Sequence, residues 1–383
     1  MVIMVSSISR LPLGREDIGL HALQILRDYG EASIDRHRLT ALANEIGEKL
    51  SSNRTEHDSG TGEQLDPRLP INDRNMIQYT IVRRSQGFVI WRRLNGEEGK
   101  TEAWDCMVNG KIFTGERAIN ACLLRALNAG LPLLDAQYLA EISSAEVQNI
   151  YRDERDGAVT LPLIEWRRSK LNEIGQTLLD LYNGQSAQIF EDADRQLFRA
   201  DGRGIVQRLV IDFPFSFGDF PFAKLAGVIC NSLYSLRLET SRTDREFAEL
   251  TNFSDPHNLF AETDYYIPMF LIRWGVIVPG EDLFESVVNH RLIEPSSPVE
   301  LSFRAATFLA LDRLVEETGI PMSRLAKEAW LTGAWRCRLC KIPSSSQEDA
   351  KLVSCPYRSD CMAFQRRPEF MAADWPLVHT PNY

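Results

Sequence analysis

TDYYIPMFLIRWG, residues 263–275, shows how the middle of the chain folds. Pro268 lacks a backbone N–H and is tolerated only in the first turn of a helix, and Gly275 is a natural C-terminal stop. The stretch therefore predicts a helix over 265–274, with Asp264 at or beside its N-cap. Free N–H groups and the helix dipole stabilise a carboxylate in its ionised form at that place.

An ionised carboxylate favours some kinds of chemistry over others. It suits the stabilisation of a ribosyl oxocarbenium ion, or binding to the amidine-like edge of a guanine-type base. It is a poorer general acid, because that role needs a raised pKa. The structural alternative is that Asp264 only caps its helix.

A second motif, DFPFAK at 219–224, supplies another carboxylate and a lysine. Lys224 opens an apolar helix expected over 223–236, where its ammonium could hold a phosphate or help a leaving base accept a proton. Asp219 could share the work with Asp264, as two carboxylates do in glycosidic cleavage. The alternatives are a solvated lysine and a turn aspartate.

Aromatic side chains flank these motifs. Nucleobases stack on such rings, so we expect base-binding faces among four of them, although each is also a candidate for the core: Phe88, Trp91, Tyr265 and Tyr266.

Four of the seven cysteines form a C-terminal cluster, Cys337-x2-Cys340-x14-Cys355-x5-Cys361. In a reducing compartment this grouping predicts a metal site with a structural role rather than disulfides. The first pair is typical of zinc. The Cys-Pro and the five-residue final gap resemble the [4Fe–4S] loop of endonuclease III relatives, and both centres stay open. Three more lie alone in apolar surroundings and are expected to be buried: Cys106, Cys122 and Cys230.

The charge of the chain is uneven. Over 383 residues the net charge is −10, which disfavours non-specific binding to duplex DNA. Residues 331–383 carry seven Lys/Arg against five Asp/Glu, a net charge of +2, which leaves −12 for the rest. The main body should therefore prefer a small ligand, whereas the basic C-terminal segment suits a nucleic acid or protein partner.

The organisation expected from these features is a main domain over 1–330 and a metal-binding tail over 331–383. The polar segment 51–68 predicts a flexible loop. No apolar run reaches the length of a membrane span, and the N-terminus lacks a basic n-region, so we expect a cytoplasmic protein without membrane contact.

Helical periodicity dominates and predicts a mostly α (α+β) fold. The segment 77–92 predicts a strand or buried extended chain, and Asn109-Gly110 predicts a hairpin over 104–113. Ser143 with Glu146, and Ser297 with Glu300, predict capping boxes. The helices expected are 18–28, 39–50, 115–128, 145–152, 166–182 and 298–317.

The order of these segments resembles the queuosine salvage protein family from about residue 69 to residue 317. Five segments carry the resemblance, namely 121–141, 161–175, 215–233, 263–275 and 295–314. It implies a helical DNA-glycosylase-like domain that cleaves the N-glycosidic bond of queuosine 5′-phosphate without a cofactor for that step. By position it implies catalytic roles for Asp219, Lys224 and Asp264, and substrate contact by Arg304. The family pattern ends before the cysteine tail.

Three family positions differ in this chain. An asparagine is replaced at Gly87, a Gly-Tyr-Trp opening reads Gly115-Glu116-Arg117, and a glutamine is replaced at Gly227. All three would lie where a deazaguanine base or its phosphate is held.

Three functional hypotheses follow. The first is an N-glycosyl hydrolase acting on a 7-deazaguanine nucleotide. The second is the same chemistry on modified DNA or RNA, or on a modified partner protein in an antiviral defence system, reached through the cysteine tail. The third is a non-catalytic module that binds a deazaguanine base.

Overall fold

The computed structural model describes residues 14–52, 73–93, 101–239, 245–337, 340, 355–366 and 368–382. Helices dominate, and the described strands form short pairs, so the predicted mostly α fold is confirmed. The chain divides into two compact units, each described here by itself. Unit 1 lies within Met1–Glu56 and Leu259–His379, and unit 2 within His57–Asn258 and Thr380–Tyr383.

Unit 2 is built around the long helix α7, Ile164–Leu181, which packs closely on α5, Ala136–Glu141. Gly175 makes this approach possible, since a Cβ there would lie 2.1 Å from the backbone nitrogen of Ala140. The other elements of the unit are α3 (Asp73–Ser85), α4 (Glu116–Asn128), α6 (Ser144–Ile150), α8 (Ala187–Asp192), α9 (Ile205–Asp212), α10 (Pro214–Phe217), α11 (Lys224–Glu239), α12 (Arg245–Leu250), the 3-10 turn Pro256–Asn258, β2 (Trp91–Arg93), β3 (Thr101–Ala103), β4 (Asp105–Val108) and β5 (Lys111–Thr114).

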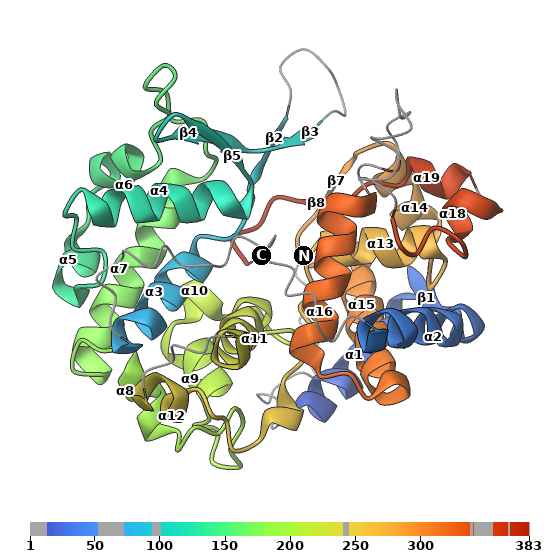
Figure 1. Cartoon of the computed structure of the whole chain (residues 1–383), viewed down its shortest axis with the longest axis horizontal. Helices are drawn as coiled ribbons and strands as arrows, with labels where there is room; N and C mark the ends of the chain where they lie inside the picture. Colours follow the sequence, from blue (N-terminus) through green and yellow to red (C-terminus); the bar gives the residue numbers. More distant parts are fainter. Residues whose placement is uncertain are drawn as a thin grey trace. The chain divides into compact units, whose positions relative to one another are not determined.

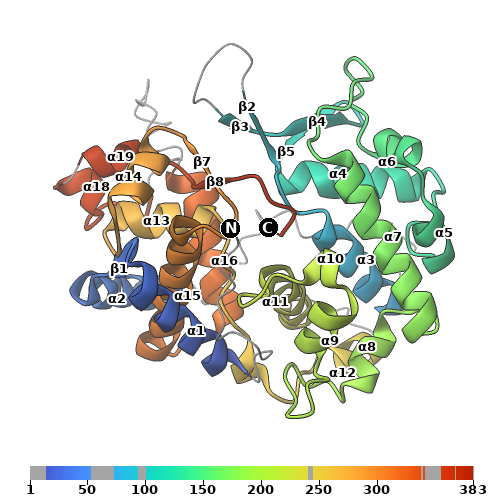
Figure 2. The ribbon, with the colours of Figure 1, turned by 180° about the vertical axis from the view of Figure 1, so that it is seen from behind.

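Two local sequence patterns in unit 2, for a hairpin and for a capping box, predicted the structure correctly. Strands β4 and β5 form the predicted hairpin, seen beside α4 in Figures 1 and 2. Asn109 and Gly110 take positive φ values of 51° and 72°, as a tight hairpin turn requires. The capping box of Ser143 and Glu146 is also confirmed at the start of α6.

The prediction of a strand or extended chain over 77–92 is wrong for most of this segment. Helix α3 occupies Asp73–Ser85, and only Trp91–Arg93 forms a strand. Tyr79, Ile81 and Val82 favour strands by propensity. The buried positions, however, repeat at helical spacing, namely Ile77, Gln78, Tyr79, Ile81, Val82, Ser85 and Gln86. Tertiary burial of this helix face therefore outweighs β propensity.

Unit 1 centres on α15, Pro298–Thr318, which lies beside α1, Arg15–Tyr29, and α2, Arg36–Ser52 (Figures 1 and 2). The other elements are α13 (Tyr266–Trp274), α14 (Glu281–Val288), α16 (Met322–Leu331), the π-helical turn Thr332–Cys337, α18 (Met362–Gln365), α19 (Glu369–Ala372), β1 (Ala32–Ile34), β6 (Ile277–Pro279), β7 (Leu292–Ile293) and β8 (Leu377–Val378).

The C-terminal segment up to His379 belongs to the same compact unit as α13 and α15. Strand β8 pairs in parallel with β7, and α18 and α19 pack against α13. The predicted division into a main domain over 1–330 and a tail over 331–383 stays a prediction. Of the predicted loop 51–68, residues 51 and 52 end α2 and the remainder lies outside the described residues. Within the described residues, no helix is both long and apolar enough to cross a membrane.

Candidate active site

Asp264 lies beside the N-terminus of α13, as predicted. Its Oδ1 accepts hydrogen bonds from the backbone N–H groups of Tyr266, at 2.9 Å, and Ile267, at 3.1 Å. At the other end Gly275 closes the helix with φ of 88°. Two N–H donors fix the orientation of the Asp264 carboxylate and favour its ionised form.

Two tyrosines follow Asp264 directly, and both are buried. The rings of Tyr265 and Tyr266 lie 4.8 Å apart, and Tyr266 meets Trp330 and Trp375 in edge-on contacts. These contacts fix the first turn of α13 within an aromatic cluster. Base stacking by the two tyrosines stays a prediction.

Arg304 reaches the same region of unit 1 from α15. Its Nη1 forms a 3.0 Å ion pair with Glu300, one helical turn earlier, and both side chains are nearly fully buried. Its Nε and Nη2 each lie 3.3 Å from Oγ1 of Thr263, the residue before Asp264. Arg304 therefore connects α15 to the segment that presents the Asp264 carboxylate.

In unit 2, Asp219 and Lys224 are brought together at the start of α11. The backbone N–H of Lys224 donates to Oδ2 of Asp219 at 3.1 Å, and both residues are buried. A Cβ at Gly218 would meet the carbonyl oxygen of Pro214 at 2.2 Å, so glycine permits this tight approach. The turn thus aims the Asp219 carboxylate at the first turn of α11.

A third ionisable group, Lys170 on α7, lies in the same region, since it interacts electrostatically with both Asp219 and Lys224. Lys170 is fully buried, and its Nζ donates to the carbonyl of Ser216 at 2.7 Å. Burial lowers the pKa of Lys170 to about 7. Glu173 accepts the N–H groups of Phe215, at 2.9 Å, and Ser216, at 2.6 Å, which fixes the segment leading to Asp219.

The family asparagine is absent at Gly87, and the backbone around it is held by Arg167. The Arg167 guanidinium donates to the carbonyls of Gln86 and Phe88, the latter at 2.6 Å, and stacks 4.2 Å from the centre of the Phe88 ring. The Phe88 ring is fully buried, and Trp91 is 5% exposed at the start of β2. Phe88 therefore packs against a buried cation, and base stacking by Phe88 and Trp91 stays a prediction.

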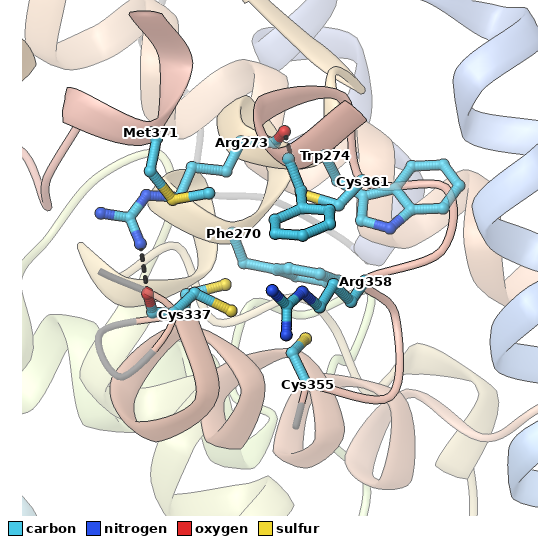
Figure 3. Close-up of a pocket in the computed structure, with 10 residues that line it drawn as sticks. Phe270, Arg273, Trp274, Cys337, Cys355, Arg358, Cys361 and Met371 are labelled. Carbon is cyan, nitrogen blue, oxygen red and sulfur yellow. Dashed lines mark hydrogen bonds between the residues drawn. The ribbon is translucent and has the colours of Figure 1, made fainter. Parts of the chain in front are cut away.

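The four tail cysteines line one small cavity in unit 1, shown in Figure 3. Among the residues that the structure describes, no group of three or more histidine, cysteine or acidic side chains is arranged to hold a metal ion as it stands. The other three cysteines are buried, as predicted, and the thiols of Cys106 and Cys122 lie 3.6 Å apart.

Sequence reasoning missed Lys170, Glu173 and Thr263 as parts of these clusters. A signal for Lys170 existed, because Arg167, Lys170, Leu171, Ile174 and Leu178 follow the spacing of one helix face, and all are buried. A lysine within a buried face is costly unless it is partnered, and such residues mark functional sites.

Comparison with known proteins gives a consistent result. The family model described as queuosine salvage protein matches residues 67–329. That range contains every predicted catalytic and substrate-contacting residue, from Phe88 to Arg304, and ends before Cys337.

Three curated relatives illustrate the similarity, and each is named queuosine 5′-phosphate N-glycosylase/hydrolase. The protein of Sphaerobacter thermophilus is 30% identical over 250 residues, covering 62% of this chain and 68% of the relative. That of Bos taurus is 25% identical over 253 residues, covering 64% and 67%. That of Schizosaccharomyces pombe is 22% identical over 292 residues, covering 75% and 81%. These names give no support to a nucleic acid substrate, a partner protein or a defence role.

Proposed function

We propose that this chain, which belongs to the queuosine salvage protein family, is an N-glycosyl hydrolase that cleaves the N-glycosidic bond of queuosine 5′-phosphate. The observation that carries the proposal is the family match over 67–329, because that range includes Asp219, Lys224 and Asp264, the three residues predicted to be catalytic. Relatives of bacterial, fungal and mammalian origin are named for this activity.

The reaction replaces a carbon–nitrogen bond with a carbon–oxygen bond. As the bond from C1′ to the base nitrogen breaks, positive charge develops on the ribosyl ring and the electron pair leaves with the base. Water adds its oxygen to C1′, one proton of the water goes to solvent, and the base nitrogen takes up a proton. The products are ribose 5-phosphate and the free deazaguanine base.

Asp264 supplies negative charge for the cationic ribosyl group. Its Oδ1 is held by two backbone N–H groups, so the carboxylate does not need to reorganise during the reaction. The same hydrogen bonds favour the ionised form, which suits charge stabilisation better than proton donation. Thr263 and Arg304 are positioning residues, since they fix the segment before Asp264.

In unit 2 we assign a separate task to Asp219 and Lys224. The Lys224 ammonium binds the 5′-phosphate or donates a proton to the departing base, and the Asp219 carboxylate orients its backbone. The buried Lys170 is a positioning residue that keeps the Ser216 carbonyl and the following turn in place.

Product release from matched substrates tests this function. Purified protein is given queuosine 5′-phosphate, the corresponding nucleoside without phosphate, or transfer RNA that contains queuosine, and the free base is measured by liquid chromatography. We expect release from the nucleotide and a lower kcat/KM for the nucleoside. Release from transfer RNA alone, or tight binding without any release, would overturn the proposal.

A further inference from the structure

The cysteine tail lies outside the family match, and its four thiols converge in one place. Cys337, Cys340, Cys355 and Cys361 all line the small cavity at the C-terminal end of α13 (Figure 3). The rest of the lining is largely apolar or cationic, and is given by Phe270, Arg273, Trp274, Arg358, Phe364 and Met371. Four cysteines separated by up to 24 positions in sequence thus share one enclosure.

The backbone that carries these thiols is ordered by hydrogen bonds of its own. Cys340 N–H donates to the carbonyl of Arg336 at 3.1 Å, and Arg358 N–H to that of Cys355 at 3.2 Å. Cys361 precedes α18, where its carbonyl accepts from the N–H of Gln365 at 3.0 Å. The Cys355 thiol is in hydrogen-bonding contact with those of Cys337 and Cys340. The Cys355 thiol therefore contacts two of the other three tail thiols.

These segments are also tied to α13. The buried Arg273 guanidinium donates to the carbonyls of Cys337 and Ala373, the latter at 2.8 and 2.6 Å. Trp274 Nε1 donates to the carbonyl of Tyr357 at 3.1 Å, and the Cys361 thiol to that of Arg273 at 3.4 Å. The last turn of α13 is thus the surface on which the cysteine segments assemble.

The electrostatics of the cavity suit a thiolate-bound metal. Four thiolates with one Zn²⁺, or with a [4Fe–4S]²⁺ cluster, form a centre with a net charge of about −2. Two guanidinium groups, those of Arg273 and Arg358, line the cavity and offset such a charge. All four cysteines are free thiols in the structure, and a thiolate-bound metal accounts for their shared cavity.

We propose that Cys337, Cys340, Cys355 and Cys361 bind a single tetrathiolate metal centre, which fastens the tail to the C-terminal end of α13. As drawn, the thiols do not form a complete coordination sphere. Metal binding therefore requires these side chains to turn toward a common centre. The Cys337-x2-Cys340 pair is typical of a zinc site, whereas Cys355-Pro356 and the five-residue gap before Cys361 resemble a cluster-binding loop.

The centre stabilises structure rather than reacting with substrate. It joins the turns around Cys337 and Cys355 to the last turn of α13. The first turn of α13 also packs against the tail, since a Cβ at Gly333 would lie 2.2 Å from the Tyr266 carbonyl oxygen. Loss of the metal should therefore lower thermal stability first. This proposal does not depend on the identity of the substrate.

Metal analysis of the full-length protein, purified without oxygen, tests the site. We expect either about one zinc per chain, or about four irons with matching sulfide and visible absorbance. Cys355→Ala should lose that metal almost completely. The matched control is Cys230→Ala, which removes another buried thiol, in unit 2, and should retain the metal content of the unaltered protein.

A second measurement guards against a Cys355→Ala variant that fails to fold. The unaltered protein is stripped with a chelator, checked by circular dichroism, and titrated with Co²⁺, which gives intense visible bands in tetrahedral thiolate sites. Bands that saturate at one equivalent support the proposal. Folded protein that is purified without zinc or iron and gives no such bands would overturn it, whatever its glycosylase activity.

Discussion

Asp264 and Arg273 stand at opposite ends of the same helix, α13. Asp264 accepts the first N–H groups of the helix, and Arg273, in its last turn, donates to the carbonyls of Cys337 and Ala373. A nine-residue helix therefore connects the carboxylate assigned to catalysis with the cavity lined by the tail cysteines. Disturbance of the tail is expected to reach the site through the position of α13.

Replacement of the Lys224 ammonium should weaken catalysis. Lys224→Met keeps the length of the side chain and removes its charge, so kcat/KM for queuosine 5′-phosphate should fall by about 10²–10³-fold. If the ammonium binds the phosphate, the loss should be smaller for the nucleoside. The control is Lys111→Met on the exposed end of β5, which should leave kcat/KM unchanged. Equal rates for Lys224→Met and the unaltered protein would exclude the assigned role.

The buried Lys170 should make stability depend on pH. Burial lowers the pKa of Lys170 to about 7 in the folded protein, whereas the unfolded chain keeps an ordinary lysine pKa of about 10.4. Between these values the unfolded state binds more protons, so the free energy of unfolding rises with pH. Below about pH 7 Lys170 is protonated in both the folded and the unfolded state, so its contribution to the free energy of unfolding no longer changes with pH.

Urea unfolding between pH 6 and 10 measures that effect. Relative to Lys170→Met, the unaltered protein should gain stability as the pH rises from about 7 to about 10, by an amount on the order of a few kcal/mol. The variant serves as the reference because all other titrating groups are common to both proteins. Parallel pH profiles would contradict the assignment of a neutral, buried lysine.

Removing one partner of the Arg304–Glu300 ion pair should lower the free energy of unfolding strongly. Both side chains are nearly fully buried, so Arg304→Met leaves an uncompensated carboxylate and should lower the free energy of unfolding by about 3–5 kcal/mol. Replacing both partners, with Glu300→Gln added, should recover part of this loss.

Arg313 on the same helix provides the matched control for that experiment. It pairs with Glu316 at 2.6 Å and Glu317 at 3.1 Å, but its side chain is 60% exposed. Arg313→Met should therefore leave the free energy of unfolding nearly unchanged. Similar losses for Arg304→Met and Arg313→Met in urea unfolding would show that burial does not strengthen the dependence on Arg304.

Sequence reasoning succeeded where the signal is local. Pro268 and Gly275 set the ends of α13, the serine and glutamate of α6 mark its start, and Asn109-Gly110 forms a hairpin turn. It failed for α3, because Tyr79 and its neighbours favour strands by propensity while the packing of the unit buries a helical face.

The partners of the predicted site residues needed the structure. The contact between Arg304 and Thr263 joins residues 41 positions apart, and that between Lys170 and Ser216 joins residues 46 positions apart. No local pattern encodes such pairs, since they arise from helix packing. The family resemblance implied roles for Asp264 and Lys224, which stay predictions, but it did not indicate the groups that hold them.

The most direct test of the proposed function is single-turnover cleavage of queuosine 5′-phosphate by Asp264→Asn. Asparagine also caps helices, so the fold should persist while the charge is lost, and release of the free base should slow by at least about 10²-fold. Asp135→Asn, at the capped start of α5, makes the same chemical change at a purely structural position and should retain full activity. Base release by Asp264→Asn at the rate of the unaltered protein would contradict the central claim.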